Sequence, residues 1–312
     1  MQTESILKKI GQQIEAGLYP GASLALYQEG AWQEFYLGFS DPDQQAVTGP
    51  GLIYDLASVS KVLGVGTILA QDYKAGQLDL DQPFCQLYPA IKDQEVTVRE
   101  LLTHTSGLDP FIPNRDSLNA QELKAALEQL DKREEKTFLY SDVNFLLLGF
   151  YLEERYGISL DQLFEERIFS LWDMKETSFG PRPGAVPTLE GQNDGQVHDP
   201  KARVLGRHAG SAGLFSSLRD LERYCQRLLE DDWASDLTHN YNQVDAKTRS
   251  LGWNLEGDWL DHTGYTGTFI MLKQETKEAA IFLSNRTYWE DDRTYWIEKR
   301  NQLMEIIRSD AR

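Results

Sequence analysis

Runs of apolar and aromatic residues with the composition of β-strands lie near both ends of this chain of 312 residues. Residues 22–27 and 32–37 are two such runs, and the glycine-containing segment 28–30 between them predicts a hairpin. Residues 268–273 and 278–284 are two more, far along the chain. A single sheet that contains all four runs must be built from both ends, with the sequence between them inserted as a further region.

Helical patterns and long loops dominate the sequence from about residue 55 to 240. Thr97 and Glu100 have the spacing of a capping box at the start of a helix. Residues 143–155 are apolar nearly all round, which predicts a buried helix. Residues 181–200 carry most of the proline and glycine punctuation and predict a long loop.

A helix is expected at each end of the chain, and together with the sheet these helices predict an α+β fold. Isoleucines at every fourth position over residues 4–16 predict an amphipathic helix that Gly17 ends. Residues 296–307 predict a closing helix. The single unit 1–312 is interpreted as a sheet region at about 1–54 and 241–312 and a mostly helical insert at about 55–240.

Composition and charge argue against several classes of partner. Hydrophobic residues make up 41% and charged residues 26%, as in ordinary soluble proteins. The formal net charge of -18 repels nucleic acid phosphates and anionic lipids, so we expect neither as a partner. The longest apolar run, 145–152, is too short to span a bilayer. Lys8 and Lys9 interrupt the apolar start, so a complete chain is expected in the cytoplasm.

Two further features are interpreted as structural. Cys85 and Cys225 are the only cysteines, too few for a disulfide framework, and are expected to be reduced core thiols. The tetrapeptide RTYW occurs at 286–289 and again at 293–296. Two copies make no repeat architecture, and we interpret them as chance or local packing.

The histidines outside the motifs described next are also expected to be structural. His198 beside Asp199 has the residue types of a metal site, but no second ligand stands at helical spacing. We therefore expect no metal and no cofactor, and we expect Val197-His198-Asp199 to brace the long loop at a pocket rim. His104 is expected to be a hydrogen-bonded core residue under the site.

Ser58-Val59-Ser60-Lys61 is the first pattern with a chemical meaning. A serine hydroxyl is a poor nucleophile until a partner takes its proton, and residues three apart on a helix share a face. If a helix starts near Ser58, Lys61 lies beside its hydroxyl while Ser60 points elsewhere. The start of that helix also offers N–H groups to an oxyanion. The structural alternative is a capping serine and a solvated lysine.

Two other patterns add possible partners. Tyr140 precedes the predicted helix 143–155 and could relay protons if a nearby cation lowered its pKa, although it could also simply pack there, with Ser141 as the helix cap. Residues 262–268, HTGYTGT, precede a predicted strand, where glycines and small hydroxyls let a substrate backbone lie along the edge. The alternative is a glycine-rich turn.

In this order, the three patterns resemble the motifs of the serine β-lactamase and penicillin-binding-protein superfamily. The resemblance is strongest to the branch with class C β-lactamases, D-alanyl-D-alanine carboxypeptidases of that type and related serine esterases. It covers about residues 20–285 and implies a β-lactamase-like fold, with an antiparallel sheet built from both termini, flanking helices and an inserted helical region. The segments that carry it are YDLASVSKVLGVGTIL, LLTHTSGL at 101–108, YSDVNFLLLG at 140–149, VHD at 197–199, AGLFSS at 212–217 and GYTGT at 264–268.

The resemblance implies a role for each matched residue. Ser58 would be the acylated nucleophile, and Lys61 and Tyr140 would share the proton transfer. The backbone N–H groups of Ser58 and Tyr265 would form the oxyanion hole. His262 would orient the substrate and tune Tyr140, and the sequence leaves open which of the three side chains is the main base.

Two residues depart from the family pattern. Asp142 stands where the family often has asparagine; facing the site it would hold Lys61 charged, whereas facing outward it would only favour the helix N-terminus. We expect it to face the site and to contact substrate together with Thr263 and Gly264. His262 stands where many relatives have lysine.

A histidine at that position is mostly neutral at pH 7 and anchors a substrate carboxylate poorly. The sequence therefore favours ester or amide substrates with a neutral end over β-lactams and D-alanyl peptides. It also predicts that His262 makes activity respond to pH between about 5.5 and 7.5.

The function that follows is a serine acyl hydrolase that forms an acyl-enzyme on Ser58 and hydrolyses a small ester or amide. A true β-lactamase or a D-alanyl-D-alanine carboxypeptidase would use the same residues, and so would an acyl transferase. From other classes, the alternatives are a penicillin-binding-type sensor that acylates without turnover and a metal hydrolase. The expected partner is a small ester, amide or lactam, and the sequence leaves the oligomeric state open.

Overall fold

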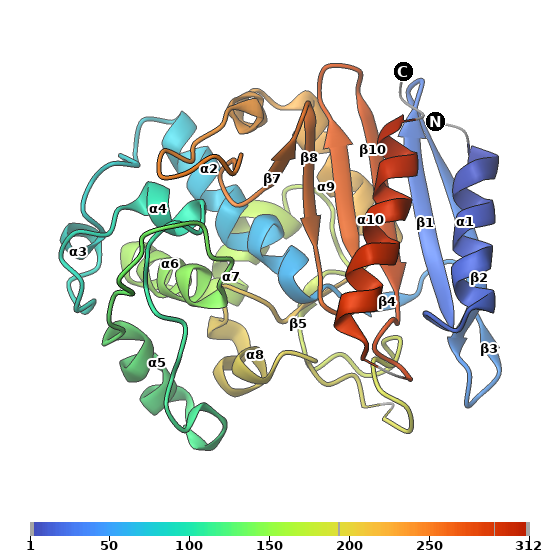
Figure 1. Cartoon of the computed structure of the whole chain (residues 1–312), viewed down its shortest axis with the longest axis horizontal. Coiled ribbons are helices and arrows are strands. Elements are labelled where there is room, and N and C mark those ends of the chain that lie inside the picture. Colours follow the sequence, from blue (N-terminus) through green and yellow to red (C-terminus); the bar gives the residue numbers. More distant parts are fainter. Residues whose placement is uncertain (1–2, 193, 290, 310–312) are drawn as a thin grey trace.

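The computed structural model describes residues 3–192, 194–289 and 291–309. Within them, seven strands form one antiparallel sheet in the order β3-β2-β1-β10-β9-β8-β7 (Figure 1). The first and last parts of the chain meet at its centre, where β1 pairs with β10, so the predicted sheet of both termini is confirmed. Its strands are β1 Gly21–Gln28, β2 Ala31–Asp41, β3 Ala46–Val47, β7 Asn254–Glu256, β8 Trp259–Thr263, β9 Phe269–Lys273 and β10 Glu278–Ser284.

The hairpin of β1 and β2 turns where the sequence predicts it. Glu29 and Gly30 both have positive φ, 54° and 81°, which suits the two-residue turns that match the twist of paired strands. The register places Tyr27 opposite Trp32, and their rings lie 5.0 Å apart. Turn chemistry and the aromatic pair therefore fix this register together.

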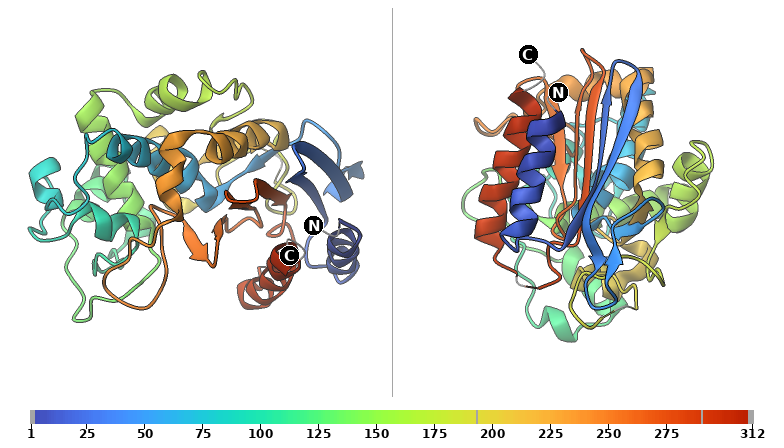
Figure 2. Two further views of the ribbon diagram at one scale, coloured as in Figure 1. Left: turned by 90° about the horizontal axis from the view of Figure 1, so that it is seen from above. Right: turned by 90° about the vertical axis from the view of Figure 1, so that its right-hand side faces the viewer.

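Helices cover both faces of the sheet. On one face α1, Thr3–Glu15, and α10, Arg293–Ser309, lie side by side (Figure 2). Phe282 on β10 packs under these two helices, whereas Ile281 and Leu283 face the helical region on the other side. Because both faces are buried, the central strands are apolar at successive positions and do not alternate with polar residues.

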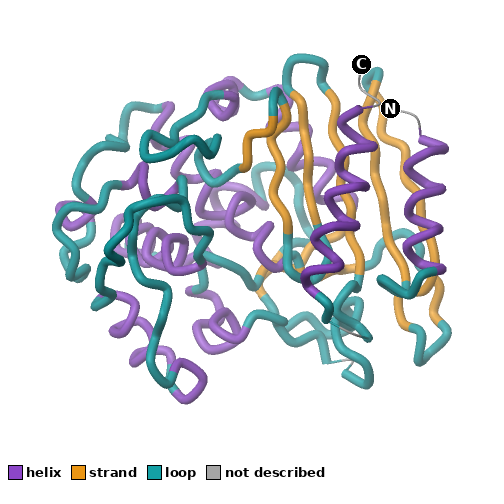
Figure 3. Tube along the Cα trace, in the orientation of Figure 1, coloured by secondary structure: helices purple, strands orange, loops and turns teal. Residues whose placement is uncertain are grey.

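The region between the sheet segments consists of helices joined by long loops, with few strands (Figure 3). α9 packs against the inner face of the sheet, and residues 143–152 of α6 are all buried, which confirms the buried helix that the sequence predicts. The helices of this region are α2 Thr67–Lys74, α3 Phe84–Leu87, α4 Val98–Leu102, α5 Ala120–Glu128, α6 Asp142–Tyr156, α7 Leu160–Phe164, α8 Pro200–Leu205 and α9 Leu218–Glu230. Short 3₁₀ or π turns lie at 57–59, 62–66, 115–117, 165–169, 206–208 and 232–238.

A second small sheet inside this region escaped the sequence analysis. Its strands are β4 Ile53–Asp55, β5 Ser178–Phe179 and β6 Leu214–Ser217, in the order β4-β6-β5. Strands of two to four residues are too short for an alternating pattern to reveal. This sheet matters for the site because β4 ends at Asp55, three residues before Ser58.

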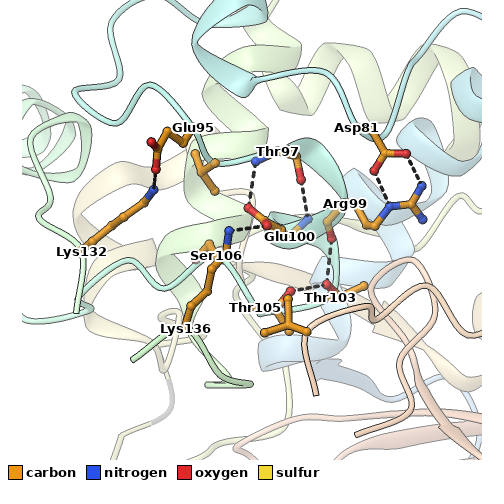
Figure 4. Close-up of polar contacts among 12 residues, drawn as sticks. Asp81, Glu95, Thr97, Arg99, Glu100, Thr103, Thr105, Ser106, Lys132 and Lys136 are labelled. Atoms are coloured by element: carbon orange, nitrogen blue, oxygen red, sulfur yellow. Dashed lines mark hydrogen bonds and ion pairs between the residues drawn. The ribbon is translucent and has the colours of Figure 1, made fainter. Parts of the chain in front are cut away.

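The capping box expected at the start of α4 is present (Figure 4). The Thr97 hydroxyl accepts a hydrogen bond from the Glu100 N–H at 3.3 Å, and the Thr97 N–H donates to the Glu100 carboxylate at 3.1 Å. Lys136 pairs with the same carboxylate. After α4, the hydroxyls of Thr103 and Thr105 lie 2.8 Å apart and fix the chain on both sides of the histidine between them.

Three other expectations concern membranes, cysteines and the long loop. Among the helices of the described residues, none has the length and apolar character needed to cross a membrane. Cys225 is a buried free thiol as expected, whereas Cys85 is only partly buried. In the predicted loop, the described residues 181–192 and 194–199 form no helix and no strand, apart from a single bridge between Leu189 and Gln192.

We predict that Phe282→Ala lowers the free energy of unfolding by about 3–5 kcal/mol, because it leaves a cavity where a fully buried ring was packed. Phe282 is fully buried, stacks on Phe269 with ring centroids 4.9 Å apart and meets Tyr19 at 5.5 Å. Denaturant unfolding measures the loss. Phe39→Ala on the exposed part of β2 is the control and should change stability little; equal losses in both variants would contradict this core.

Candidate active site

Ser58 lies in the 3₁₀ turn Ala57–Val59, which opens a continuous helical segment that ends with α2. Because Lys61 follows by one turn, its Nζ donates a hydrogen bond of 2.8 Å to Ser58 Oγ. The Ser60 hydroxyl instead accepts from the Leu214 N–H at 3.1 Å. The side chains therefore point as the spacing predicts, with Ser58 and Lys61 together and Ser60 directed away.

A buried carboxylate fixes the turn that carries Ser58. Ala57 has a φ of 45°, a conformation that non-glycine residues adopt at some cost. Its N–H donates to one oxygen of Asp55 at 2.8 Å, and the N–H of His198 donates to the other at 2.7 Å. Burial raises the pKa of Asp55 to about 6. Asp55 thus links the Ser58 turn to the long loop, as expected of the segment around His198.

Lys61 is fully buried in a cluster of oxygens. Its Nζ also donates to Asp142 Oδ1 at 2.7 Å and to the Ser211 carbonyl at 2.9 Å. Burial disfavours the ammonium, but the Asp142 carboxylate outweighs it, so the pKa of Lys61 lies above its usual value. Burial likewise opposes ionisation of Asp142, yet Lys61 and Lys201 hold its pKa below the usual value. At rest the two groups are an ammonium and a carboxylate, and Asp142 faces the site as expected.

Tyr140 stands at the mouth of α6 with 38% of its surface exposed. Lys61 Nζ lies 5.2 Å from the centre of its ring, and the ring of His104 lies 4.5 Å away on another side. Nδ1 of His104 accepts from the Ser141 N–H at 3.3 Å and lies 3.1 Å from the Asn144 amide nitrogen. His104 is therefore the buried, hydrogen-bonded residue that the sequence predicts, and it holds the segment that carries Tyr140.

The turn between β8 and β9 is fastened directly to the segment before Ser58. A Cβ atom on Gly264 would lie 2.6 Å from the Leu56 carbonyl oxygen, so only glycine allows this approach. The hydroxyls of Thr266 and Thr268 donate to the carbonyls of Asp55 and Leu56, at 2.8 and 3.0 Å. These two hydroxyls thus serve to position the protein backbone, whereas the sequence suggested that hydroxyls of this motif line the substrate.

The two backbone N–H groups expected to form the oxyanion hole are those of Ser58 and Tyr265. The Ser58 N–H precedes the first hydrogen bond of its 3₁₀ turn, which the Val59 N–H donates. In the β8–β9 turn, the N–H groups of Gly264 and Gly267 make the internal hydrogen bonds. Among the described residues, the N–H of Tyr265 has no backbone partner, so both groups of the expected oxyanion hole are available.

His262 lies on β8 with 1% of its surface exposed, and its ring centroid is 6.1 Å from that of Tyr140. Neither ring nitrogen has a hydrogen-bond partner within the described part of the chain. Burial, followed by the charges of Lys61 and Arg249, holds the pKa of His262 well below its usual range. The expectation of a titration between pH 5.5 and 7.5 is therefore wrong, because the sequence does not reveal this burial or these cations.

One cavity of about 720 Å³ collects the expected residues. Lys61 does not line it and lies beneath Ser58. The expected site residues on its wall are Ser58, Tyr140, Asp142, His262, Thr263, Gly264 and Tyr265.

Several cations on the same wall were missed by the sequence analysis. Arg286 and Arg293 are the first residues of the two RTYW segments, and their guanidinium carbons lie 4.9 and 5.6 Å from the Tyr265 ring centre. Arg300 Nη1 donates to the Thr263 hydroxyl at 3.1 Å. The repeated tetrapeptide was thus a signal of the site. Its seven-residue spacing brings two arginines to one tyrosine.

Lys201 was also missed. It lines the cavity from α8 and pairs with Asp142 at 2.9 Å. The neighbouring Asp199 caps α8 by accepting from the Ala202 N–H at 2.8 Å, and the His198 ring stacks on Tyr265. Among the residues described, no cluster of three histidine, cysteine, aspartate or glutamate side chains is placed to hold a metal ion.

Comparison with known proteins gives one family. The sequence model of the Beta-lactamase family matches residues 7–304. A protein of Escherichia coli K12 named a putative D-alanyl-D-alanine carboxypeptidase is 26% identical to this chain, in an alignment that covers 89% of this chain and 81% of that protein.

Solved structures share the fold at low identity. A β-lactamase/D-alanine carboxypeptidase from Pseudomonas syringae matches with a TM-score of 0.76 and 17% identity, over 95% of this chain and 97% of the other. The hydrolase EstCE1, described as having promiscuous acyltransferase activity, matches with a TM-score of 0.76 and 18% identity, over 96% and 98%. These likenesses confirm the expected α+β fold.

We predict that the pKa of His262 in the folded protein lies well below that of an unperturbed histidine, because burial and the charges of Lys61 and Arg249 disfavour the charged ring. Histidine-selective NMR measures this, with His262→Gln to assign the signal. Since the unfolded chain takes up a proton below about pH 6.5 and the folded state does not, stability should fall with decreasing pH by about 1.4 kcal/mol per unit from this group. His262→Gln should fall less steeply. A His262 signal that titrates near 6.5 would contradict this picture.

Proposed function

Because the chain belongs to the beta-lactamase family, and is therefore a serine hydrolase, we propose that it cleaves small esters or amides through an acyl-enzyme on Ser58. The observation that carries this proposal is the 2.8 Å hydrogen bond between Lys61 Nζ and Ser58 Oγ at the floor of the cavity. A nucleophilic serine requires a neighbouring group that accepts its proton, and Lys61 lies within hydrogen-bonding distance of the Ser58 hydroxyl.

The proposed acylation has three parts. Ser58 Oγ attacks the substrate carbonyl while its proton leaves toward Lys61 and Tyr140. The oxygen of the tetrahedral intermediate accepts hydrogen bonds from the N–H groups of Ser58 and Tyr265. The leaving group then departs with a proton from the same pair of side chains, and water repeats these steps to release the acid. Since Lys61 rests as an ammonium, it must give up its proton before it can accept one.

The cations of α10 support a carboxylate-bearing substrate. Arg293 and Arg300 line the cavity, Arg293 near the Tyr265 ring and Arg300 at the Thr263 hydroxyl. Within the described residues neither makes an ion pair. Burial, together with neighbouring arginines, lowers the pKa of Arg300, so an anion bound there would relieve a local excess of positive charge. We therefore propose that these arginines hold a carboxylate. They supply the fixed cation that His262 lacks, which argues against the neutral-ended substrates that the sequence favoured.

A D-alanyl-D-alanine carboxypeptidase is the specific candidate within this class. Its substrate ends in a carboxylate next to the cleaved amide, and the Escherichia coli relative carries that name as a putative function. A β-lactam presents a carboxylate in a similar place. Chromogenic esters, D-amino acid amides and nitrocefin, each run on wild type and a Ser58 variant, separate these activities.

We predict that Ser58→Ala abolishes turnover of every substrate that the wild type accepts, with a loss on the order of a millionfold, because no other group replaces the nucleophile. Steady-state kinetics on p-nitrophenyl esters measure the loss, and circular dichroism checks the fold.

Ser60→Ala is the matched control, since its hydroxyl binds the Leu214 N–H and lies outside the reaction. It should keep most of the activity. A dead Ser60→Ala enzyme beside an active Ser58→Ala enzyme would overturn the assignment of the nucleophile.

We predict that Arg300→Ala raises KM for a carboxylate-bearing ester about 10- to 100-fold, as expected for loss of charge-assisted hydrogen bonds. KM for the matched neutral methyl ester should stay within about twofold, because no anion is lost there. Steady-state kinetics on the pair of esters measure this difference.

Lys299→Ala is the control on the same helix, because its side chain pairs with Glu298 and does not line the cavity. It should leave both KM values unchanged. Equal changes in KM for the two esters in Arg300→Ala would show that the arginine does not bind the substrate carboxylate.

A further inference from the structure

Asp142 is held by two lysines, one on each oxygen. Lys61 Nζ lies 2.7 Å from Oδ1 and Lys201 Nζ lies 2.9 Å from Oδ2. Lys61 is fully buried, and the Lys201 side chain is 12% exposed. The three residues come from different parts of the chain, since Asp142 begins α6 and Lys201 lies on α8. The carboxylate is therefore shared and not committed to the lysine beside Ser58.

The position of Lys201 is fixed by the start of α8. Asp199 caps this helix with one oxygen, and its other oxygen lies 3.6 Å from Lys201 Nζ. Pro200 occupies the first turn, where its fixed φ suits a helix start. Lys201 thus lies between two carboxylates, and its ammonium does not need to move to reach Asp142.

The other ionisable groups around Asp142 do not compete with Lys61 and Lys201 for its two oxygens. His104, in the loop after α4, and His262, on β8, face this cluster. Burial holds the pKa of each well below the usual range, so both are neutral. Arg115 approaches Lys201 from the cavity wall and pairs with Asp116. Tyr140 lies beside Lys61. The charges that act directly on Asp142 are therefore the two ammonium groups.

Sharing changes what Lys61 can do. A carboxylate that served Lys61 alone would hold its proton tightly and oppose transfer from Ser58. A second ammonium on the far oxygen draws negative charge away from Lys61 and repels its positive charge. Both effects favour the neutral amine, which is the form that can accept a proton.

We propose that Lys201 is a positioning residue for the Ser58 reaction, which holds the second oxygen of Asp142 and so allows Lys61 to release its proton. The proposal rests on the proposed acylation of Ser58. It also accounts for an aspartate at a position where the resemblance leads one to expect asparagine, because the extra negative charge has its own partner.

The first test is Lys201→Met, assayed on a neutral chromogenic ester so that binding of a carboxylate plays no part. We expect kcat/KM at about pH 7.5 to fall roughly tenfold and its alkaline-rising limb to move up by about one pH unit, with KM little changed. Lys201→Arg, which keeps a cation that can bridge both carboxylates, should stay within about threefold of wild type. Lys201→Gln replaces Lys201→Met if thermal melting shows that the methionine variant does not fold.

The second test repeats Lys201→Met in an Asp142→Asn background. With no carboxylate to share, the loss should shrink to less than about threefold. An equal shift of the limb in both backgrounds would overturn the proposal, because Lys201 would then act without Asp142. A change in KM alone would also overturn it and make Lys201 a substrate ligand. Wild-type activity that survives Ser58→Ala would instead refute the proposed function, so the two failures are distinct.

Discussion

The ion pair between the buried Lys61 and the partly buried Asp142 is the interaction on which the site depends. Burying an ammonium and a carboxylate is costly unless each has partners, and here every polar atom of the pair is used. To supply those partners, the helical segment after β4, the start of α6, the Ser211 loop and α8 must all converge on one point. Ser58 Oγ accepts a hydrogen bond from Lys61 Nζ at this point. The position of the hydroxyl therefore depends on the ion pair that holds Lys61.

The same balance of charge shapes the cavity. A chain with a net charge of -18 repels anions at long range, yet its cavity wall carries arginines from α10 and from the segment after β10. A low-dielectric cleft focuses such a local field, so a bound anion experiences the wall more than the distant surface. In the proposed function, the arginines of α10 supply the fixed cation that a neutral His262 lacks.

Motif order made much of the site predictable, whereas tertiary neighbours remained hidden. The spacing of Ser58 and Lys61 is local, so a helix alone brings them together, and the family match confirms the resemblance that the ordered motifs carry. Lys201 and Asp142 are 59 positions apart and meet only after folding. The pKa of His262 depends on burial and on Arg249, which no local pattern reveals. Likewise, strands as short as β5 offer no periodicity to detect.

The most direct measurement of the central claim is the mass of the enzyme during turnover. Acid quenching in the burst phase of ester hydrolysis, followed by proteolysis and mass spectrometry, locates any covalent acyl group. The account predicts that the acyl group is on the peptide that contains Ser58, in an amount equal to the burst, and that fragmentation places it on Ser58 and not on Ser60. An acyl adduct on another residue would contradict it. So would a clear burst of product without any acylated enzyme.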